Sequence, residues 1–174
     1  CVNERPYVWL EKTPDHAYHL DEIDQWYPSV KVIHIIRHPV PTVYSMKEHL
    51  SGRSIFSLAG RWRASVEAVQ AFRNQEKVFV LKYEDLVHDV EGNIEKICSF
   101  LRIPFDRGSL SRYKDIGRSV TMANEPWKLG VQNEIKRNRN TSALGKSTML
   151  HRLMIYLQTH QVSVQLGYFS PRPL

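Results

Sequence analysis

The distribution of apolar residues along the chain predicts three buried strands. Residues 7–10, 30–36 and 78–83 are short, nearly continuous apolar runs rich in β-branched or aromatic side chains. A strand that is apolar at almost every position is buried on both faces, which is typical of a parallel sheet. The three runs therefore predict a parallel sheet that is covered on both sides.

Apolar residues at intervals of three and four predict amphipathic helices between and after these strands. The clearest stretches are 55–72, 94–101 and 150–157. Asp89 and Ser147 precede the second and the third of them and are the expected N-caps. Strands that alternate with helices predict a three-layer α/β domain, in which helices flank the parallel sheet.

The periodicity fades between residues 107 and 146. This stretch is rich in Gly, Arg, Lys and Asn and has few apolar residues. Such a segment within a domain is either a functional covering loop or disordered. Trp127 favours the loop, because an indole side chain gains from burial.

The composition is that of a soluble globular domain. The chain has 174 residues, with 42% hydrophobic and 24% charged residues, which suits one domain with a proper core. It contains no apolar run of membrane-spanning length and no signal-peptide pattern, so we expect a cytoplasmic location. Because it begins without Met and close to a predicted strand, we also expect it to be incomplete at its N-terminus, where an upstream signal or anchor would lie.

Charge and cysteine content add little to this assignment. A net charge of +6 favours anionic ligands, although a solvated basic surface explains the charge equally well. Cys1 and Cys98 are too few for a disulfide framework. Cys98 lies on the apolar face of a predicted helix and is expected to be an inert core thiol.

The most informative pattern is the end of the second strand. Arg37 ends that strand, Pro39 and Pro41 occupy the first turn of a predicted helix, and Ser45 follows eight residues after Arg37. This arrangement offers a guanidinium, the N-terminal amides of a helix and a hydroxyl to one anion. It predicts a phosphate pocket.

The other two predicted strands also end in polar residues. Glu11, Lys12 and Thr13 follow the first strand, and Tyr83 ends the third. The carboxyl ends of parallel strands border the crevice in which ligands bind. Taken alone, Glu11 and Lys12 are better explained as a surface ion pair, and Tyr83 is equally explained as a core aromatic. Residues 84 and 85 are expected to be helix or turn formers.

The order of these motifs resembles that of the sulfotransferases that use 3′-phosphoadenosine 5′-phosphosulfate (PAPS). The resemblance covers nearly the whole chain and is closest to the broad carbohydrate and bacterial branch. It implies a P-loop NTPase-like α/β fold, with residues 1–174 as the C-terminal portion of one domain and 107–146 as a segment covering cofactor and substrate. The motifs are EKTP at 11–14, an Arg-x-Pro strand end, a Ser eight residues after that Arg, a Trp, KYEDL at 82–86, FLRIP at 100–104, EPWK at 125–128 and LGY at 166–168.

The resemblance implies a role for each matching residue of the cofactor site. Arg37 and Ser45 match the pair that holds the 3′-phosphate of PAPS, in agreement with the predicted phosphate pocket. Tyr83 matches the aromatic residue that contacts the adenine. Lys128 lies in the late loop that closes over nucleotide and acceptor.

The implied reaction is an in-line transfer of a sulfuryl group from PAPS to an acceptor hydroxyl or amine. Glu11 matches the general base of several carbohydrate sulfotransferases, and Lys12 a lysine that stabilises charge near the sulfuryl group. The cytosolic branch has a histidine base where this chain has Pro14, which leaves His16 as a second, weaker candidate. No metal is expected, because no cluster of His and Cys has ligand spacing.

Three readings of the function remain open from the sequence. No glycine lies in a G-x-x-x-x-G-K-[ST] pattern, so the loop that holds the 5′-phosphosulfate in the family is not found. A nucleotide-binding or interaction module without catalysis is therefore the alternative to an enzyme. Nucleic-acid binding through the basic residues 136–140 is disfavoured, because no aromatic residues are interleaved there. The acceptor, a small molecule or a carbohydrate, and the oligomeric state are not determined by the sequence.

Overall fold

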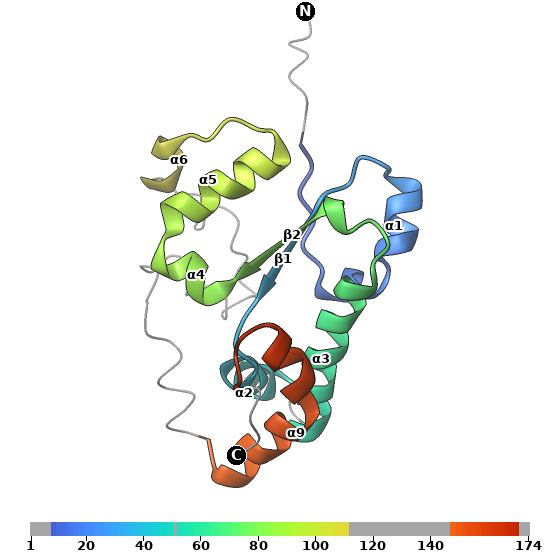
Figure 1. Ribbon diagram of the computed structural model, residues 1–174, viewed down its shortest axis with the longest axis vertical. Coiled ribbons are helices and arrows are strands. Elements are labelled where there is room, and N and C mark those ends of the chain that lie inside the picture. Colours follow the sequence, from blue (N-terminus) through green and yellow to red (C-terminus); the bar gives the residue numbers. More distant parts are fainter. Residues whose placement is uncertain (1–7, 51, 112–146, 171–174) are drawn as a thin grey trace, which may run out of the picture.

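The computed structural model describes residues 8–50, 52–111 and 147–170 (Figure 1). Two strands alternate with helices, as predicted, and the chain continues into a long C-terminal helix. In chain order the elements are η1 (Pro14–Tyr18), α1 (Leu20–Trp26), β1 (Val32–Ile36), α2 (Pro39–His49), α3 (Ile55–Ala71), η2 (Gln75–Lys77), β2 (Val78–Lys82), α4 (Tyr83–His88), α5 (Val90–Leu101), α6 (Arg107–Ser111) and α9 (Met149–Gln165), where η marks a short 3-10 helix.

The two strands of the described sheet are parallel and adjacent. Their register runs from Val32 opposite Val78 to Ile36 opposite Lys82. The connection between them passes through α2 and α3, as expected for parallel strands joined by a crossover. The second and third predicted strands are thus confirmed. The third ends one residue early, because Tyr83 begins α4 instead of ending the strand.

The predicted first strand is wrong for the residues that the structure describes. Residues 8–10 are not part of a strand, and position 7 lies outside the described residues. Val8, Trp9 and Leu10 are 61%, 77% and 79% exposed. An isolated apolar run with no neighbouring strand has no partner for its backbone N–H and C=O groups, so the sequence pattern alone does not produce a strand.

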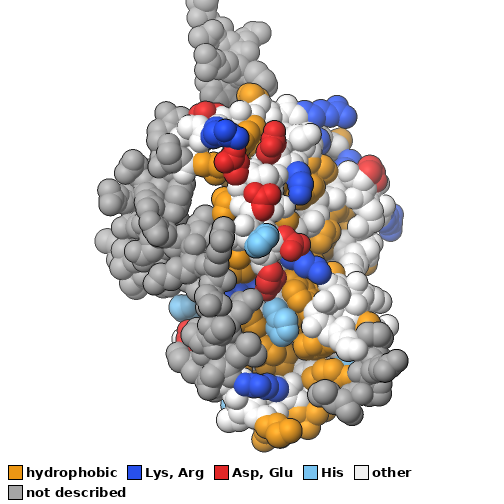
Figure 2. All heavy atoms as spheres, turned by 60° about the vertical axis from the view of Figure 1, so that its left-hand side comes forward, with side chains coloured by type: hydrophobic (Ala, Val, Ile, Leu, Met, Phe, Trp, Pro, Cys, Tyr) orange, Lys and Arg blue, Asp and Glu red, His pale blue; other side chains and the backbone are white. Residues whose placement is uncertain are grey.

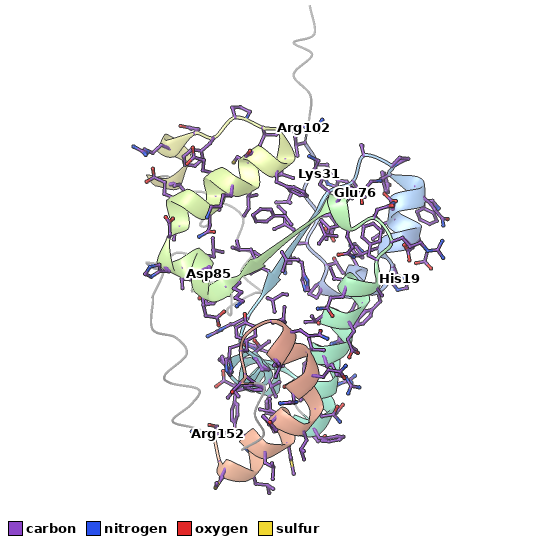
Figure 3. All side chains as sticks on the ribbon, in the orientation of Figure 1. His19, Lys31, Glu76, Asp85, Arg102 and Arg152 are labelled. Atoms are coloured by element: carbon purple, nitrogen blue, oxygen red, sulfur yellow. The ribbon has the colours of Figure 1, made fainter. Side chains whose placement is uncertain are left out.

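Helices lie on both sides of the strands. In Figure 1, α4, α5 and α6 lie on one side, α1 and α3 on the other, and α2 and α9 beyond the carboxyl ends of the strands. Lys31, just before β1, donates a hydrogen bond to Phe100 O near the C-terminal end of α5, and Figure 3 shows Lys31 close to Arg102 at that end of the structure. An ammonium group is stabilised there by the carbonyl groups at the end of the helix.

The main core lies where α2, α3 and α9 meet the carboxyl end of β1. Its largest fully buried apolar side chains are Val43 of α2, Leu58 and Val66 of α3, and Ile155 of α9. By contrast, Ile35 of β1 is 49% exposed, and Val80 of β2 is 51% exposed. The described sheet is therefore less completely buried than the helices at its end.

The helix N-caps follow the sequence signals with one correction. Asp89 accepts from Gly92 N at 3.0 Å and caps α5, as predicted. The prediction of Ser147 as the cap of α9 is wrong, because the adjacent Thr148 accepts from His151 N. A hydroxyl one residue closer to the helix is placed to reach the N–H three residues on.

Two further observations concern residues discussed from the sequence. Cys98 is half-buried, so it lies at the margin of the apolar packing and not in the centre of the core as expected. Within the part of the chain that the structure describes, no helix combines the length and the apolar character needed to cross a membrane.

We predict that the α9 contact dominates the stability of this core. Ile155→Ala should lower the free energy of unfolding by about 2–5 kcal/mol, because it leaves a cavity between three helices. Leu157→Ala in the same helix is the matched control, since Leu157 is 67% exposed, and should change the stability by less than about 0.5 kcal/mol. Urea unfolding of both variants measures the difference, and equal losses would contradict this account of the core.

Candidate functional site

The pairing of the two strands continues past their last hydrogen-bonded residues. Ile36 and Lys82 form the last pair, and the next residues are Arg37 and Tyr83. The guanidinium carbon of Arg37 lies 4.7 Å from the centre of the Tyr83 ring, a cation–π contact worth about 0.5–1 kcal/mol at an exposed site. The two side chains predicted to hold a nucleotide, one from each strand end, are therefore in contact, and both are half-buried.

Glu84 forms the next link between the strand ends. Its Oε1 accepts from His38 N at 3.1 Å, and its Oε2 accepts from the Tyr168 hydroxyl at 3.0 Å. The Tyr168 hydroxyl also lies 3.1 Å from Ile36 O, the carbonyl at the end of β1. Sequence reasoning treated Glu84 as a helix or turn former and missed this role, because its partners are 46 and 84 residues away in the chain.

Two more side chains hold the turn between β1 and α2. The Trp62 indole of α3 donates to Arg37 O at 3.1 Å, and the Thr42 hydroxyl of α2 donates to His38 O at 2.9 Å. Neutral hydrogen bonds of this kind contribute about 0.5–1.5 kcal/mol each. The backbone that carries Arg37 is therefore fixed from several elements at once.

Ser45 lies in the second turn of α2 and is exposed. It shares a helix face with His38 and Thr42, seven and three residues earlier. Side chains on a helix tilt toward its N-terminus, so Ser45 is directed toward the end of α2 at which Arg37 lies. The structure thus places Arg37 just before α2 and Ser45 in the second turn of the same helix.

The expectation that α2 offers free N-terminal amides is wrong. The His38 amide is bonded to Glu84, and the Val40 amide is bonded to His38 Nδ1 at 3.2 Å. Pro39 and Pro41 have no amide hydrogen. Because all four of these positions are accounted for, an anion at this helix end would depend on side-chain donors, above all on Arg37.

Glu11 and His16 form a second group, in an exposed segment. The Thr13 hydroxyl donates to Glu11 Oε1, and His16 Nδ1 lies 3.7 Å from the same oxygen. The hydrogen bond from Thr13 is the main cause that lowers the pKa of Glu11, with smaller contributions from Lys12 and His16. Glu11 is therefore ionised at neutral pH. Lys12 itself is exposed.

Helix α3 connects the two groups. The Arg61 guanidinium pairs with Asp15 of η1, and Arg61 O accepts from the Tyr18 hydroxyl at 3.4 Å. The next residue, Trp62, bonds to Arg37 O. The structure thus brings Glu11 together with His16, and Arg37 together with Tyr83, with α3 between them. Lys128, Trp127 and residues 136–140 lie outside the described residues.

The charges on the visible surface are mixed. Figure 2 shows the molecule from the side of α4–α6, and acidic, basic and histidine side chains lie interspersed on its described part. Among the described residues, no three His, Cys, Asp or Glu side chains gather in a way that would hold a metal ion.

The pKa values of His38 and Tyr168 are shifted by their surroundings at the strand ends. Burial is the main cause that lowers the pKa of His38, and nearby Arg37 adds to it, while Glu84 opposes it. Because His38 Nδ1 accepts from Val40 N, the imidazole caps α2 in its neutral form. Burial and Glu84 raise the pKa of Tyr168 well above its ordinary range, so this phenol remains a hydrogen-bond donor. Burial likewise lowers the pKa of His34 in β1.

The matched relatives are sulfotransferases. The profile of the Sulfotransferase family matches residues 2–107, which is more than half of the chain. The chain is 31% identical over 105 residues to Cytosolic sulfotransferase 14 of Arabidopsis thaliana, covering 45% of this chain and 28% of that protein. It is 32% identical over 81 residues to 3-alpha-hydroxysteroid sulfotransferase of Cavia porcellus, covering 47% of this chain and 27% of that protein.

The family match over residues 2–107, together with the strand-end site, identifies the class of protein. The chain belongs to the sulfotransferase family, and its parallel strands and flanking helices are part of the P-loop-like α/β fold of that family. The family predicted from the motifs is confirmed, whereas the carbohydrate and bacterial branch stays a prediction. The matches span less than a third of the length of these curated relatives.

We predict that acid destabilises the strand-end turn through His38. A buried imidazole with a lowered pKa stays neutral while the unfolded chain takes up a proton, so stability should fall as the pH drops from about 6.5 toward the lowered pKa. His38→Asn should reduce the loss of stability between pH 7.5 and pH 5.5, because Asn also caps helices and does not titrate. Urea unfolding at the two pH values measures this. His34 should leave a residual dependence of the same sign, and an unchanged loss in the variant would contradict the assignment.

Proposed function

We propose that the protein is a PAPS-dependent sulfotransferase that transfers a sulfuryl group to an acceptor hydroxyl or amine. The observation that carries the proposal is the contact of Arg37 with Tyr83 at the carboxyl ends of adjacent parallel strands. In α/β folds, ligands bind outside the carboxyl ends of the strands. A guanidinium beside an aromatic ring suits a nucleotide that carries both a phosphate and a base.

The residues at the strand ends fit the 3′-phosphoadenosine part of PAPS. Arg37 has a planar set of N–H donors for a phosphate, and Ser45 would add a hydroxyl from the second turn of α2. Tyr83 supplies a ring for the adenine, and Lys128 is proposed to close over the nucleotide. Residues 1–174 would form one sulfotransferase-like domain, with 107–146 covering cofactor and substrate. PAPS, when bound, supplies the activated sulfuryl group.

Glu11 is the proposed general base for the acceptor. Its carboxylate is ionised, and the Thr13 hydroxyl holds it in one orientation. His16, with its Nδ1 3.7 Å from Glu11, is the second candidate. Lys12, on the same segment, is proposed to stabilise charge near the transferred group. Positioning and charge stabilisation supply most of the catalysis in transfers of this type. No metal is assigned a role.

The alternative is a nucleotide-binding module without catalysis. The observation that favours it is the exposure of Glu11, Lys12 and His16, all on one exposed segment. Transfer of label from [³⁵S]PAPS to a panel of acceptors separates the two functions. The relative named for a hydroxysteroid supports starting that panel with small-molecule alcohols, with carbohydrates next. The relative named cytosolic supports a cytoplasmic location.

Arg37→Ala should weaken binding of 3′-phosphoadenosine 5′-phosphate (PAP) by about 10- to 100-fold, because it removes a charge-assisted contact. Binding of adenosine 5′-phosphate should change much less, since this nucleotide has no 3′-phosphate. Arg73→Ala, an exposed arginine beyond the end of α3, is the matched control and should leave both affinities unchanged. Calorimetry with the two nucleotides measures this, and an equal loss for both would refute the 3′-phosphate assignment.

Glu11→Gln should lower the turnover with PAPS by about 10²- to 10⁴-fold, because the amide cannot accept the proton of the acceptor. The affinity for PAP should stay within about twofold, since Glu11 belongs to the other group of side chains. His16→Asn is the comparison variant and should have the smaller effect. A Glu11→Gln protein with undiminished turnover would assign the base to His16 instead.

A further inference from the structure

We infer that Tyr168 and Glu84 form a positioning clamp, which sets the placement of Arg37 relative to Tyr83 and thereby the affinity for a nucleotide 3′-phosphate. This inference rests on the proposed function, because it assigns residues that support the same site. Neither residue is proposed to touch the nucleotide. The clamp consists of the Tyr168 hydroxyl, the Glu84 carboxylate and their contacts to Ile36 O and His38 N.

The clamp contacts the strand ends on the side of the buried core. Ile36 and Lys82 are a register pair, so their side chains share one face, and Ile36 belongs to the buried core. Tyr168 lies on that face, with the Lys82 ammonium 5.2 Å from the centre of its ring. The residue after Ile36 is Arg37, whose guanidinium lies against the ring of Tyr83, the first residue of α4. Tyr168 thus affects Arg37 and Tyr83 through the backbone.

Each carboxylate oxygen of Glu84 accepts one hydrogen bond of the clamp. One accepts the His38 amide of the β1–α2 turn, and the other accepts the Tyr168 hydroxyl. Because Glu84 is in the first turn of α4, next to Tyr83, it ties the residue after Arg37 to the residue after Tyr83. The residues on both sides of Arg37 and the residue after Tyr83 are thereby fixed, which leaves little freedom for the two side chains to separate.

The C-terminal end of α9 fixes Tyr168 itself. Tyr168 N donates to Ser163 O at 2.7 Å, and Gly167 N donates to Val164 O at 2.9 Å, which is the Schellman pattern that ends many helices. Gly167 has φ +70°, a conformation that favours glycine. The Leu-Gly-Tyr sequence therefore turns Tyr168 back over the strand ends. Because α9 packs in the core, its position determines where Tyr168 contacts the strand ends.

The first test is Tyr168→Phe. This variant keeps the ring contact with His38, at 5.4 Å between centroids, but removes the hydroxyl that bonds to Ile36 O and Glu84. The affinity for PAP should fall by about 3- to 10-fold, the usual effect of one lost hydrogen bond. The ratio of PAP affinity to adenosine 5′-phosphate affinity should also fall, because misplacement of Arg37 affects only the nucleotide that has a 3′-phosphate.

Tyr44→Phe is the matched control. It also removes a tyrosine hydroxyl bond, to His151 Nδ1 at 2.7 Å, but this bond joins α2 to the beginning of α9 and not to the strand ends. The control should lower stability without changing the ratio of the two nucleotide affinities. An equal change of the ratio in both variants would mean that Tyr168 contributes only general stability, and it would overturn the inference.

The Glu84 variants provide an independent measurement, also if Tyr168→Phe does not fold. Glu84→Gln retains an amide oxygen for His38 N and should keep most of the ratio, whereas Glu84→Ala should lose it. In the double variant Glu84→Ala with Tyr168→Phe, the losses should be less than additive, because both remove one clamp. Equal effects of Gln and Ala, or full additivity, would contradict the clamp.

The outcomes also separate this inference from the proposed function. If the unsubstituted protein prefers PAP and Arg37→Ala abolishes the preference, the nucleotide site stands. Under that condition, an unchanged ratio in Tyr168→Phe and Glu84→Ala overturns the clamp alone. If the unsubstituted protein shows no preference for PAP over adenosine 5′-phosphate, both the proposed nucleotide site and the clamp are overturned.

Discussion

The hydrogen bond from His38 N to Glu84 is the interaction on which the candidate site depends. It extends the parallel pairing of β1 and β2 beyond Ile36 and Lys82, into two chain segments that have already left the sheet. Parallel strands normally diverge into separate loops at this point. Here a carboxylate takes the place of the next backbone acceptor, and Arg37 remains beside Tyr83 as a consequence.

This constraint bears on the proposed anion site at a helix start that contains two prolines. Helix N-termini usually attract anions through free amides. In α2 the prolines remove two amides, and the other two are bonded to Glu84 and His38. The attraction of an anion would therefore depend on the Arg37 side chain, which has a defined position only if its backbone is fixed. Trp62 and Thr42 hold the backbone carbonyls of Arg37 and His38.

Much of the fold was predictable because its signals are local. The strands around Ile36 and Leu81, the helices α3, α5 and α9, and the Asp89 cap follow from periodicity and from short-range polar residues, and the order of motifs identified the family. The strand at residues 8–10 failed, because pairing depends on a neighbour that an apolar run does not specify. The role of Glu84 was missed for a similar reason, since its hydrogen-bond partners are far away in the sequence and no local pattern predicts them.

The two halves of the candidate site differ in rigidity, and this difference bears on the proposed chemistry. The proposed nucleotide side is fixed by partly buried hydrogen bonds, whereas Glu11 lies on an exposed segment, where Thr13 lowers its pKa. A carboxylate with a low pKa is a weak base, because it gains little by accepting a proton. An acceptor that covers Glu11 would remove water from it, and burial raises the pKa of a carboxyl group. On this view, binding of the acceptor itself would strengthen Glu11 as a base, so that proton transfer is favoured only when the molecule to be modified is in place.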